Sequence, residues 1–476
     1  MHREPVKNRG IQFKNAFFAV QSIILTTMIK KRWIFFFVAL LILCGLGLMD
    51  SGIGAGGFWG LDPKVDAANV AWMITATIFV LMMTPGLSFF YGGMVRAKNV
   101  ISTMLQSFIA MGIISVLWVF VGFSLAFGDD IGHLIGNPAT FFMFKGVDGH
   151  VNEMLAPTLP LALYALFQMK FAIITPSLIT GSFAERVRFS AYMVFMILFC
   201  LFVYCPLAHW TWHPDGFLRQ LGVLDFAGGI VVHASSGVAA LAGALFLGRR
   251  SEIRHEPANV PFVLLGAAML WLGWFGFNAG SSLAADSIAV RAFLNTNTAS
   301  AMAMIPWVVF DCLRGRKPSA MGAAIGAVVG LVAITPSAGY VSVGESIFIA
   351  FITTIICNLA VTWKNKASTF DDALDVFPTH GVGGIVGTIL TGVFVYDGGS
   401  MTHWESFLAH VLAVVIVFVY TFVVTYALYW LTNKMIPMRV SVASERIGLD
   451  QSQHDEHYGN EVATERELAE YSESHH

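Results

Sequence analysis

The sequence predicts an all-α integral membrane protein, and three observations support that prediction. The 476 residues are 56% hydrophobic and only 12% charged, whereas soluble globular proteins carry about 25% charged residues. Apolar stretches long enough to cross a bilayer recur along the chain, and the basic residues between them alternate sides. A net charge of −2, without a basic patch, gives no support to a nucleic-acid partner.

Eleven apolar stretches approach the length of about 20 residues that a helix needs to cross a bilayer. The eighth and tenth are weak alone, because glycine lowers their hydropathy. The predicted spans are Val70–Gly92, Asn99–Phe127, Leu159–Phe183, Phe189–Trp210, Phe226–Gly248, Val260–Phe277, Ala292–Phe310, Ala320–Thr335, Ile347–Trp363, Val376–Val395 and Phe407–Leu431.

Basic residues predict the orientation, since short cytoplasmic loops carry an excess of lysine and arginine. With the N-terminus outside, twelve basic residues fall in predicted cytoplasmic loops and three in external loops. The C-terminus is then cytoplasmic, in a multi-pass protein of the cell (inner) membrane. The cytoplasmic set is Arg96, Lys98, Arg186, Arg188, Arg249, Arg250, Arg254, Arg314, Arg316, Lys317, Lys364 and Lys366, and the external set is Lys145, Arg219 and Arg291.

The two ends of the chain differ from the predicted membrane domain, residues 58–437. Residues 1–57 form an N-terminal extension in which three basic residues, an apolar run from Trp33 to Met49 and small residues predict a cleaved signal peptide. The alternative is a retained twelfth helix, and Met28 is a candidate start. Residues 438–476 form a polar, acidic tail, expected to be solvated or to serve regulation or docking.

Two acid–histidine pairs lie in otherwise apolar spans: Asp225 with His233, and Asp375 with His380. Ionisable groups are costly in a bilayer, so they predict a path for a polar solute. Each histidine precedes a helix of small residues, which indicates a five-plus-five repeat with one helix added. An odd-numbered repeat must be inverted, and inverted repeats place their site near the midplane, where the two histidines would meet.

Imidazole suits a small solute that donates or accepts a proton. A metal site is a poor alternative, since no carboxylate or thiol cluster accompanies the two histidines. Asp225 has a second interpretation, as the N-cap of its helix. Asp375 can likewise be either a functional acid or an N-cap. No nucleophile–base set or cofactor motif indicates an enzyme.

Aromatic side chains cluster in the third, fourth and sixth predicted spans: Phe171 in the third, Trp210 and Trp212 at the end of the fourth, and Phe275 and Phe277 in the sixth. Several of these rings, converging with a hydroxyl such as that of Ser281, would form a cation–π cage. The alternative is an aromatic belt at the membrane surface.

Ordered motifs from Asn69 to Asp450 make this chain similar to the ammonium transporter (Amt/Mep/Rh) family, in its bacterial and archaeal Amt branch. They are Phe90-Tyr91-Gly92-Gly93 with Lys98-Asn99, Phe167-Gln168 with Phe171-Ala172, Gly181 with Ala184-Glu185-Arg186, Tyr204 to Trp212, Asp225 to His233, Gly273 to Ser281, and Asp375 to Gly381.

The resemblance implies a role for each candidate residue. Trp212, Phe171 and Ser281 would recruit ammonium from outside, with Asp225 stabilising that site and assisting deprotonation. Phe171 and Phe277 would be stacked gating rings. His233 and His380 would line the pore.

The resemblance also implies a cofactor-free homotrimer with one pore per subunit. It further implies a PII-type signal protein at the cytoplasmic face, where a tail with the turn Gly448-Leu449-Asp450 packs. The expected activity is electrogenic uptake in which ammonia and the proton cross separately. The alternatives are an ammonium sensor signalling through the tail and an Rh-like ammonia gas channel.

Two departures from the family pattern stand out. Lys170 lies next to Phe171, where a small or apolar residue is usual. Adjacent helix positions point about 100° apart, so we expect Lys170 to face away from the pore. The stretch from Trp212 to Asp225 is one residue longer than usual, which an external loop should tolerate.

Overall fold

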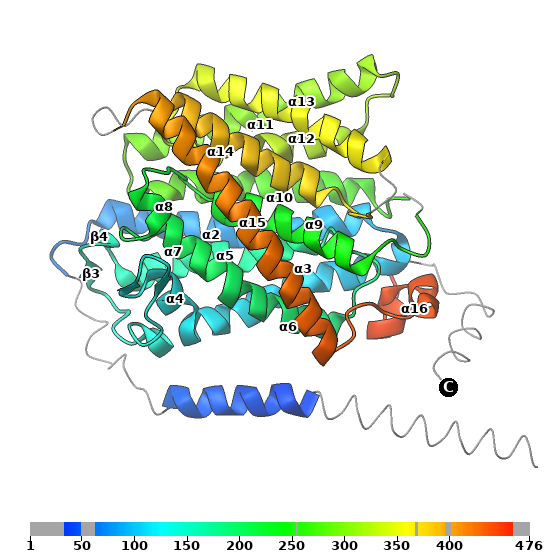
Figure 1. The fold of residues 1–476 in the computed structure, drawn as a ribbon, viewed down its shortest axis with the longest axis horizontal. Coiled ribbons are helices and arrows are strands. Elements are labelled where there is room, and N and C mark those ends of the chain that lie inside the picture. Colours follow the sequence, from blue (N-terminus) through cyan, green and yellow to red (C-terminus); the bar gives the residue numbers. More distant parts are fainter. Residues whose placement is uncertain (1–32, 49–61, 254–255, 367–369, 396–400, 460–476) are drawn as a thin grey trace, which may run out of the picture.

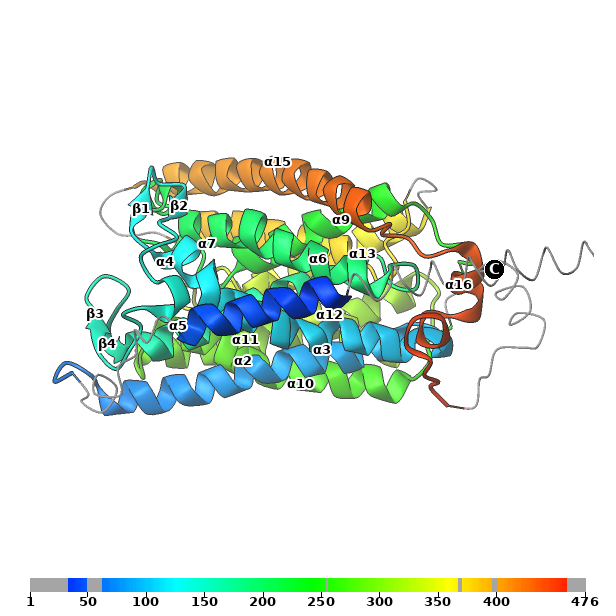
Figure 2. The same cartoon turned by 90° about the horizontal axis from the view of Figure 1, so that it is seen from below.

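The described part of the chain forms a bundle of long helices running side by side. The structure is a computed structural model that describes residues 33–48, 62–253, 256–366, 370–395 and 401–459. Two short β-hairpins lie at one end of the bundle, and α16 (Val442–Ile447) lies at the other (Figures 1 and 2). We call these the hairpin end and the tail end.

Nine helical segments of the described chain are long and apolar enough to cross a membrane. This makes the protein an all-α, multi-pass membrane protein. Their helices are α2 (Ala67–Met94), α3 (Val100–Leu117) with α4 (Phe123–Phe127), α5 (Leu161–Ile179), α6 (Phe189–Phe199) with α7 (Cys205–Trp212) and α8 (Phe217–Gln220), α9 (Ser235–Leu247), α10 (Val260–Ala279), α13 (Val343–Lys366), α14 (Val382–Phe394) and α15 (His403–Met435).

Two further helices occupy the predicted seventh and eighth spans. They are α11 (Ser287–Leu313) and α12 (Ala320–Ile334), and α12 has only 15 residues. Every predicted span is therefore helical, while the count of eleven crossings and their orientation stay predictions. The helix starts follow local chemistry: for example, Asn259 and Asp286 accept backbone N–H bonds as N-caps of α10 and α11.

Loops that the sequence predicts on one side do meet at one end. Loops after α2, α5, α9 and α13 are joined by ion pairs at the tail end. The hairpins belong to the loop between α4 and α5. Their strands are β1 (Asp130–Ile131), β2 (Ile135–Gly136), β3 (Val151–Asn152) and β4 (Ala156–Pro160), paired β1 with β2 and β3 with β4.

Short 3-10 and π-helical turns interrupt the long helices. Those in or beside the spans are η1 (Ala97–Asn99), η2 (Trp118–Gly122), η4 (Cys200–Tyr204), η5 (Gly229–Ala234), η6 (Gly280–Ser282) and η7 (Phe377–Gly381), while η3 (Phe142–Phe144) lies in the loop and η8 (Asp450–His454) in the tail. π-helical turns often mark functional sites, and η5 and η7 each carry one candidate histidine.

Glycine allows the two histidine-bearing segments to cross closely. A Cβ placed on Gly237 of α9 would lie 2.0 Å from the backbone nitrogen of Gly381 in η7. Small residues let membrane helices approach at backbone distance. This crossing brings the predicted repeat halves together at the site.

The N-terminal and C-terminal predictions are only partly within the described residues. The helix Trp33–Leu48 lies at the edge of the bundle (Figure 1). Most of its side chains are exposed. The rest of the predicted signal peptide lies outside the described residues, so its cleavage stays a prediction. In the tail, α16 and η8 pack on the tail end, and residues beyond 459 lie outside the description.

Candidate functional site

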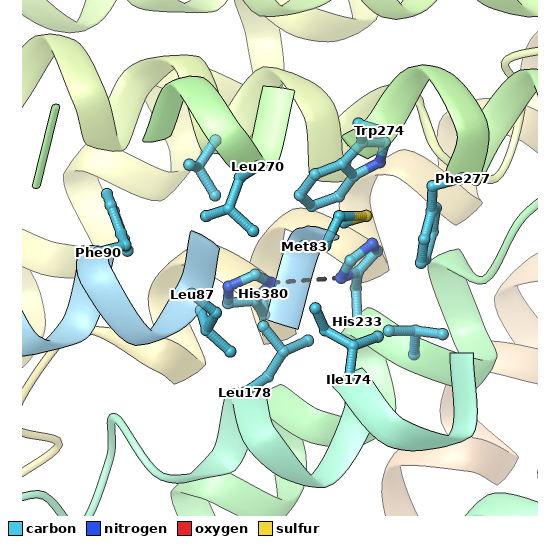
Figure 3. Close-up of a pocket in the computed structure, with 12 residues that line it drawn as sticks. Met83, Leu87, Phe90, Ile174, Leu178, His233, Leu270, Trp274, Phe277 and His380 are labelled. Carbon is cyan, nitrogen blue, oxygen red and sulfur yellow. Dashed lines mark hydrogen bonds between the residues drawn. The ribbon is translucent and has the colours of Figure 1, made fainter. Parts of the chain in front are cut away.

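His233 and His380 meet in the centre of the bundle, as the sequence predicts. Their Nδ1 atoms lie 3.3 Å apart and the ring centroids 5.4 Å apart (Figure 3). One Nδ1 must donate and the other accept in such a contact, so two neutral rings then differ at Nε2: one is an acceptor and one a donor. The pair thus offers both hydrogen-bonding roles at one place.

The space around the two rings is narrow and apolar. Its cavity measures about 10 Å³, close to the room that a single water molecule needs. His233 Nε2 has no hydrogen-bond partner within the described protein. The other lining side chains carry one nitrogen or oxygen atom among them, the Trp274 Nε1, which donates to Thr335. They are Met83, Leu87, Phe90, Ile174, Leu178, Val232, Leu270, Trp274, Phe277 and Val328.

Two phenyl rings close this lumen on its hairpin side. Phe171 and Phe277 have centroids 4.3 Å apart with planes tilted by 32°, and Phe277 lies 5.9 Å from the His233 ring. Both rings are buried. A solute can reach the histidines from this side only if the rings move.

A vestibule of about 260 Å³ lies on the other side of the rings. Phe171, Trp212, Ser281 and Asp225 all line it, so the four predicted recruitment residues converge. Trp212 stands edge-on to Phe171, with centroids 5.7 Å apart. The Ser281 hydroxyl donates to the Phe277 carbonyl oxygen at 2.8 Å, which leaves its oxygen free to accept. Aromatic faces with an acceptor oxygen suit a small cation that carries N–H groups.

Comparison with known proteins agrees with this geometry. A sequence model of the Ammonium Transporter Family matches residues 71–458. The chain belongs to the ammonium transporter family. It is 44% identical over 402 residues to a putative ammonium transporter of Methanothermobacter thermautotrophicus, which covers 82% of this chain and 98% of that protein. It is 43% identical to an Aquifex aeolicus ammonium transporter, covering 83% and 94%.

A solved structure shows the same fold. The crystal structure of Saccharomyces cerevisiae Mep2 matches with a TM-score of 0.76 at 34% identity, covering 84% of this chain and 94% of that one. Archaeal and bacterial relatives thus confirm the resemblance, and the yeast structure confirms the helical membrane fold.

Within this ammonium transporter family member, Asp225 caps the π-helical turn η5. Its Oδ1 accepts from the backbone N–H of Gly228 and Gly229 at 2.9 and 2.6 Å, and Oδ2 accepts from Ile230 and Val231 at 2.8 and 3.3 Å. Burial raises the pKa of this carboxyl, and the four N–H bonds oppose the rise. The Trp212 Nε1 also donates to the Asp225 carbonyl oxygen at 3.0 Å. Asp225 therefore shapes the vestibule through the backbone and Trp212.

The matching acid in the second half is Asp372, which corrects the predicted pairing with Asp375. Asp372 accepts from the backbone N–H of Val376 and Phe377 at 3.1 and 2.8 Å. It precedes His380 by eight residues, the same spacing as Asp225 to His233. Asp375 instead adopts a positive φ of 59° and pairs with Lys364 at 2.6 Å. Burial raises the pKa of Asp372 to about 6.

Lys170 lines neither the vestibule nor the lumen. Lys170 is itself buried, at 9% exposed, and Leu166, one turn earlier on the same face of α5, is 39% exposed, so this face reaches the surface of the bundle at Leu166. The ammonium group lies 3.7 Å from the Met169 sulfur and has no carboxylate partner among the described residues. This agrees with the expectation that Lys170 faces away from the pore.

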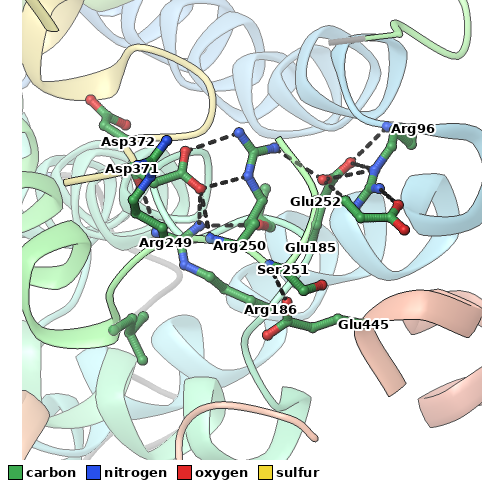
Figure 4. Close-up of polar contacts among 12 residues, drawn as sticks. Arg96, Glu185, Arg186, Arg249, Arg250, Ser251, Glu252, Asp371, Asp372 and Glu445 are labelled. Carbon is green, nitrogen blue, oxygen red and sulfur yellow. Dashed lines mark hydrogen bonds and ion pairs between the residues drawn. The ribbon is translucent and has the colours of Figure 1, made fainter. Parts of the chain in front are cut away.

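Charged residues cluster instead at the tail end, in what we call the tail-end ion-pair cluster: Arg96, Glu185, Arg250 and Asp371 (Figure 4). Arg250 binds both oxygens of Asp371 at 2.8 and 2.9 Å and reaches Glu185 at 3.0 Å. Burial alone would raise the pKa of Asp371, but Arg250 lowers it to about 2. The cluster ties together loops that follow four different helices.

Sequence reasoning missed three residues of the site. Trp274 stacks 5.2 Å from the His233 ring. Gln168 and Tyr164 line the vestibule. Trp274 and Gln168 stood inside the quoted family motifs, but nothing in their spacing distinguished a lining side chain from a packed one.

Proposed function

We propose that this chain transports ammonium by splitting it at the vestibule, passing ammonia through the histidine lumen and the proton separately. The observation that carries the proposal is the order of parts: an aromatic vestibule, two closed rings, then an apolar lumen with one polar pair. In this scheme Trp212, Phe171 and Ser281 bind ammonium and Phe171 with Phe277 gates the lumen. Asp225 stabilises the vestibule, and His233 with His380 conducts ammonia.

The physics of a narrow, apolar lumen supports the split. Moving an ion out of water into apolar surroundings is far more costly than moving a neutral polar molecule. Ammonia keeps a hydrogen bond in passing, because the histidine pair offers a donor and an acceptor. Potassium has no proton to give up, so the same lumen rejects it.

The alternative of an Rh-like gas channel predicts no charge movement. A vestibule with aromatic faces and a free acceptor oxygen favours a bound cation, and a neutral gas has no need of one. We therefore place electrogenic transport first.

The alternative of a sensor rests on the tail. Asp450 accepts from the backbone N–H of Ile101 and Ser102 at 3.0 and 2.7 Å, so the tail is joined to the start of α3. We place this contact second, as regulation of transport. The homotrimer, a PII-type partner at the tail end, the cytoplasmic tail after residue 437 and an inner-membrane location belong to the same proposal.

A charge-movement measurement tests the proposal. The purified protein is reconstituted in liposomes on a solid-supported membrane and given ammonium pulses at several pH values. We expect a saturable current that follows the ammonium concentration when ammonia is held constant. Protein-free liposomes and a potassium pulse are the controls. Absence of a saturable current would contradict electrogenic transport and favour the gas channel or the sensor.

A further inference from the structure

One acceptor in the vestibule is left without a partner. Gln168 lies on α5, one turn before Phe171, and its side chain lines the vestibule. The residue is 8% exposed, yet its Oε1 has no hydrogen-bond partner in the described protein. Buried polar atoms are nearly always paired, so an unpaired acceptor that lines a cavity calls for a ligand.

Tyr164 lines the vestibule beside this amide. It lies one turn earlier on the same face of α5. The Gln168 side chain therefore faces the vestibule between two aromatic side chains of its own helix, Tyr164 and Phe171, while its Oε1 stays unpaired.

We propose that Gln168 Oε1 is a second hydrogen-bond acceptor for ammonium, beside Ser281, and that it selects ammonium over methylammonium. This inference rests on the proposed function, because it assumes that the vestibule binds the cation. Ammonium carries four N–H groups in a tetrahedral arrangement. Two can point to Gln168 and Ser281 while others face the rings of Trp212 and Phe171.

Methylammonium has one N–H fewer and a methyl group in its place. Its three N–H groups are enough for both acceptor oxygens, so the methyl group must then take one of the two remaining directions. The four identical N–H groups of ammonium satisfy both oxygens in any orientation, whereas methylammonium does so only in the orientations that keep its methyl group away from them. Gln168 therefore contributes to selectivity by restricting the orientation of methylammonium, as well as to affinity.

Two substitutions at Gln168 test this in opposite directions. Gln168→Leu removes the acceptor at similar volume, and we expect the half-saturating ammonium concentration to rise about tenfold. We expect the preference for ammonium over methylammonium to fall as well, by less than tenfold, because both cations lose one hydrogen bond and only the restriction on orientation differs between them. Gln168→Glu strengthens the acceptor, so the half-saturating concentration falls and the maximal current drops, because the cation leaves more slowly.

Gln106→Leu is the matched control. Gln106 is also a buried glutamine with an unpaired Oε1, but it lies on α3 and lines neither the vestibule nor the lumen. We expect its half-saturating concentration and selectivity to match the wild type.

The readout is the solid-supported-membrane current for both cations, with reconstituted protein quantified for each variant. Unchanged affinity and selectivity in Gln168→Leu, or an equal effect of Gln106→Leu, overturns the inference while leaving ammonium transport intact. A shift of Gln168→Leu and Gln168→Glu in the same direction also overturns it. Absence of current in the wild type is a failure of the proposed function instead.

Discussion

The histidine lumen and the tail-end ion-pair cluster are two buried polar regions of one membrane protein, and they treat polar groups in opposite ways. In the lumen, His233 keeps an unpaired Nε2 among apolar walls. In the cluster, Arg250 makes bonds to both Asp371 and Glu185. The lumen thus contains a nitrogen atom that is available for a hydrogen bond, whereas the polar groups named in the cluster bond to one another.

The difference separates transport from stability. A buried donor or acceptor without a hydrogen-bond partner destabilises the folded protein, and a passing solute can supply the missing hydrogen bond. A buried charge that is fully paired holds loops together but has nothing to offer a solute. Substitutions in the two regions should therefore act on different measurements.

The largest expected effect is on stability, from Arg250→Ala. Removing this guanidinium leaves Asp371 and Glu185 buried without their shared partner, which costs about 3–5 kcal/mol. The measurement is thermal unfolding of the detergent-solubilised protein. Arg250→Lys, which keeps the charge but loses the two-point contact with Asp371, should cost less. A loss below that of Arg250→Lys would mean that the cluster is solvated and the comparison fails.

The next effect is on transport, from His233→Leu. The substitution removes the hydrogen bond that we propose ammonia makes in the lumen, which predicts about a tenfold smaller current. The free energy of unfolding should fall by only about 1 kcal/mol, because the substitution breaks one contact, with His380 Nδ1, and the replaced Nε2 has no partner within the described protein. His233→Gln, which keeps a donor and an acceptor, should retain more current. Equal stability losses in His233→Leu and Arg250→Ala would erase the distinction between the regions.

The paired caps give a smaller, graded effect. Asp225→Asn disturbs four backbone N–H bonds and Asp372→Asn disturbs two. We expect losses of about 2 and about 1 kcal/mol in unfolding free energy. Ammonium affinity should fall only in Asp225→Asn, since Asp225 lines the vestibule and a disturbed cap shifts the backbone carbonyl oxygen that accepts from Trp212 Nε1. The reverse order of the two stability losses would contradict the assignment of Asp225 as the stronger cap.

The smallest effect is expected from Lys170→Ser. Because the lysine lines neither the vestibule nor the lumen, transport should stay within about twofold of the wild type. The same current measurement decides it. A large gain in current would show that the lysine charge acts on a solute in the lumen. The lumen would then contain Lys170 as a third polar group beside His233 and His380.

Sequence reasoning anticipated the two histidines better than their acids. A histidine inside an apolar span stands out, and two of them in matching surroundings predicted a meeting that the 3.3 Å Nδ1 contact confirms. The prediction of the acid that accompanies the second histidine was wrong. The sequence analysis paired Asp375 with His380, whereas Asp372 caps the turn that carries His380. The chain carries several acids in this loop, and their backbone partners are visible only in three dimensions.

Gln168 shows a different limit. A single amide in an apolar helix has no periodic signal, so its free oxygen cannot be inferred from its neighbours in sequence. Its role depends on which side chains from α7 and η6 face the same cavity. That convergence follows from how the helices pack.

The sequence alone determined the apolar spans, the alternation of basic loops and the two spans that contain an acid and a histidine. It could do so because a bilayer constrains the length and the charge of each segment separately. Which atoms meet was decided only by the tertiary structure. The π-helical turns at His233 and His380 and the close crossing at Gly237 set the direction of each ring. Direction and distance between side chains from distant segments have no counterpart in composition or spacing, since they arise only when the helices pack.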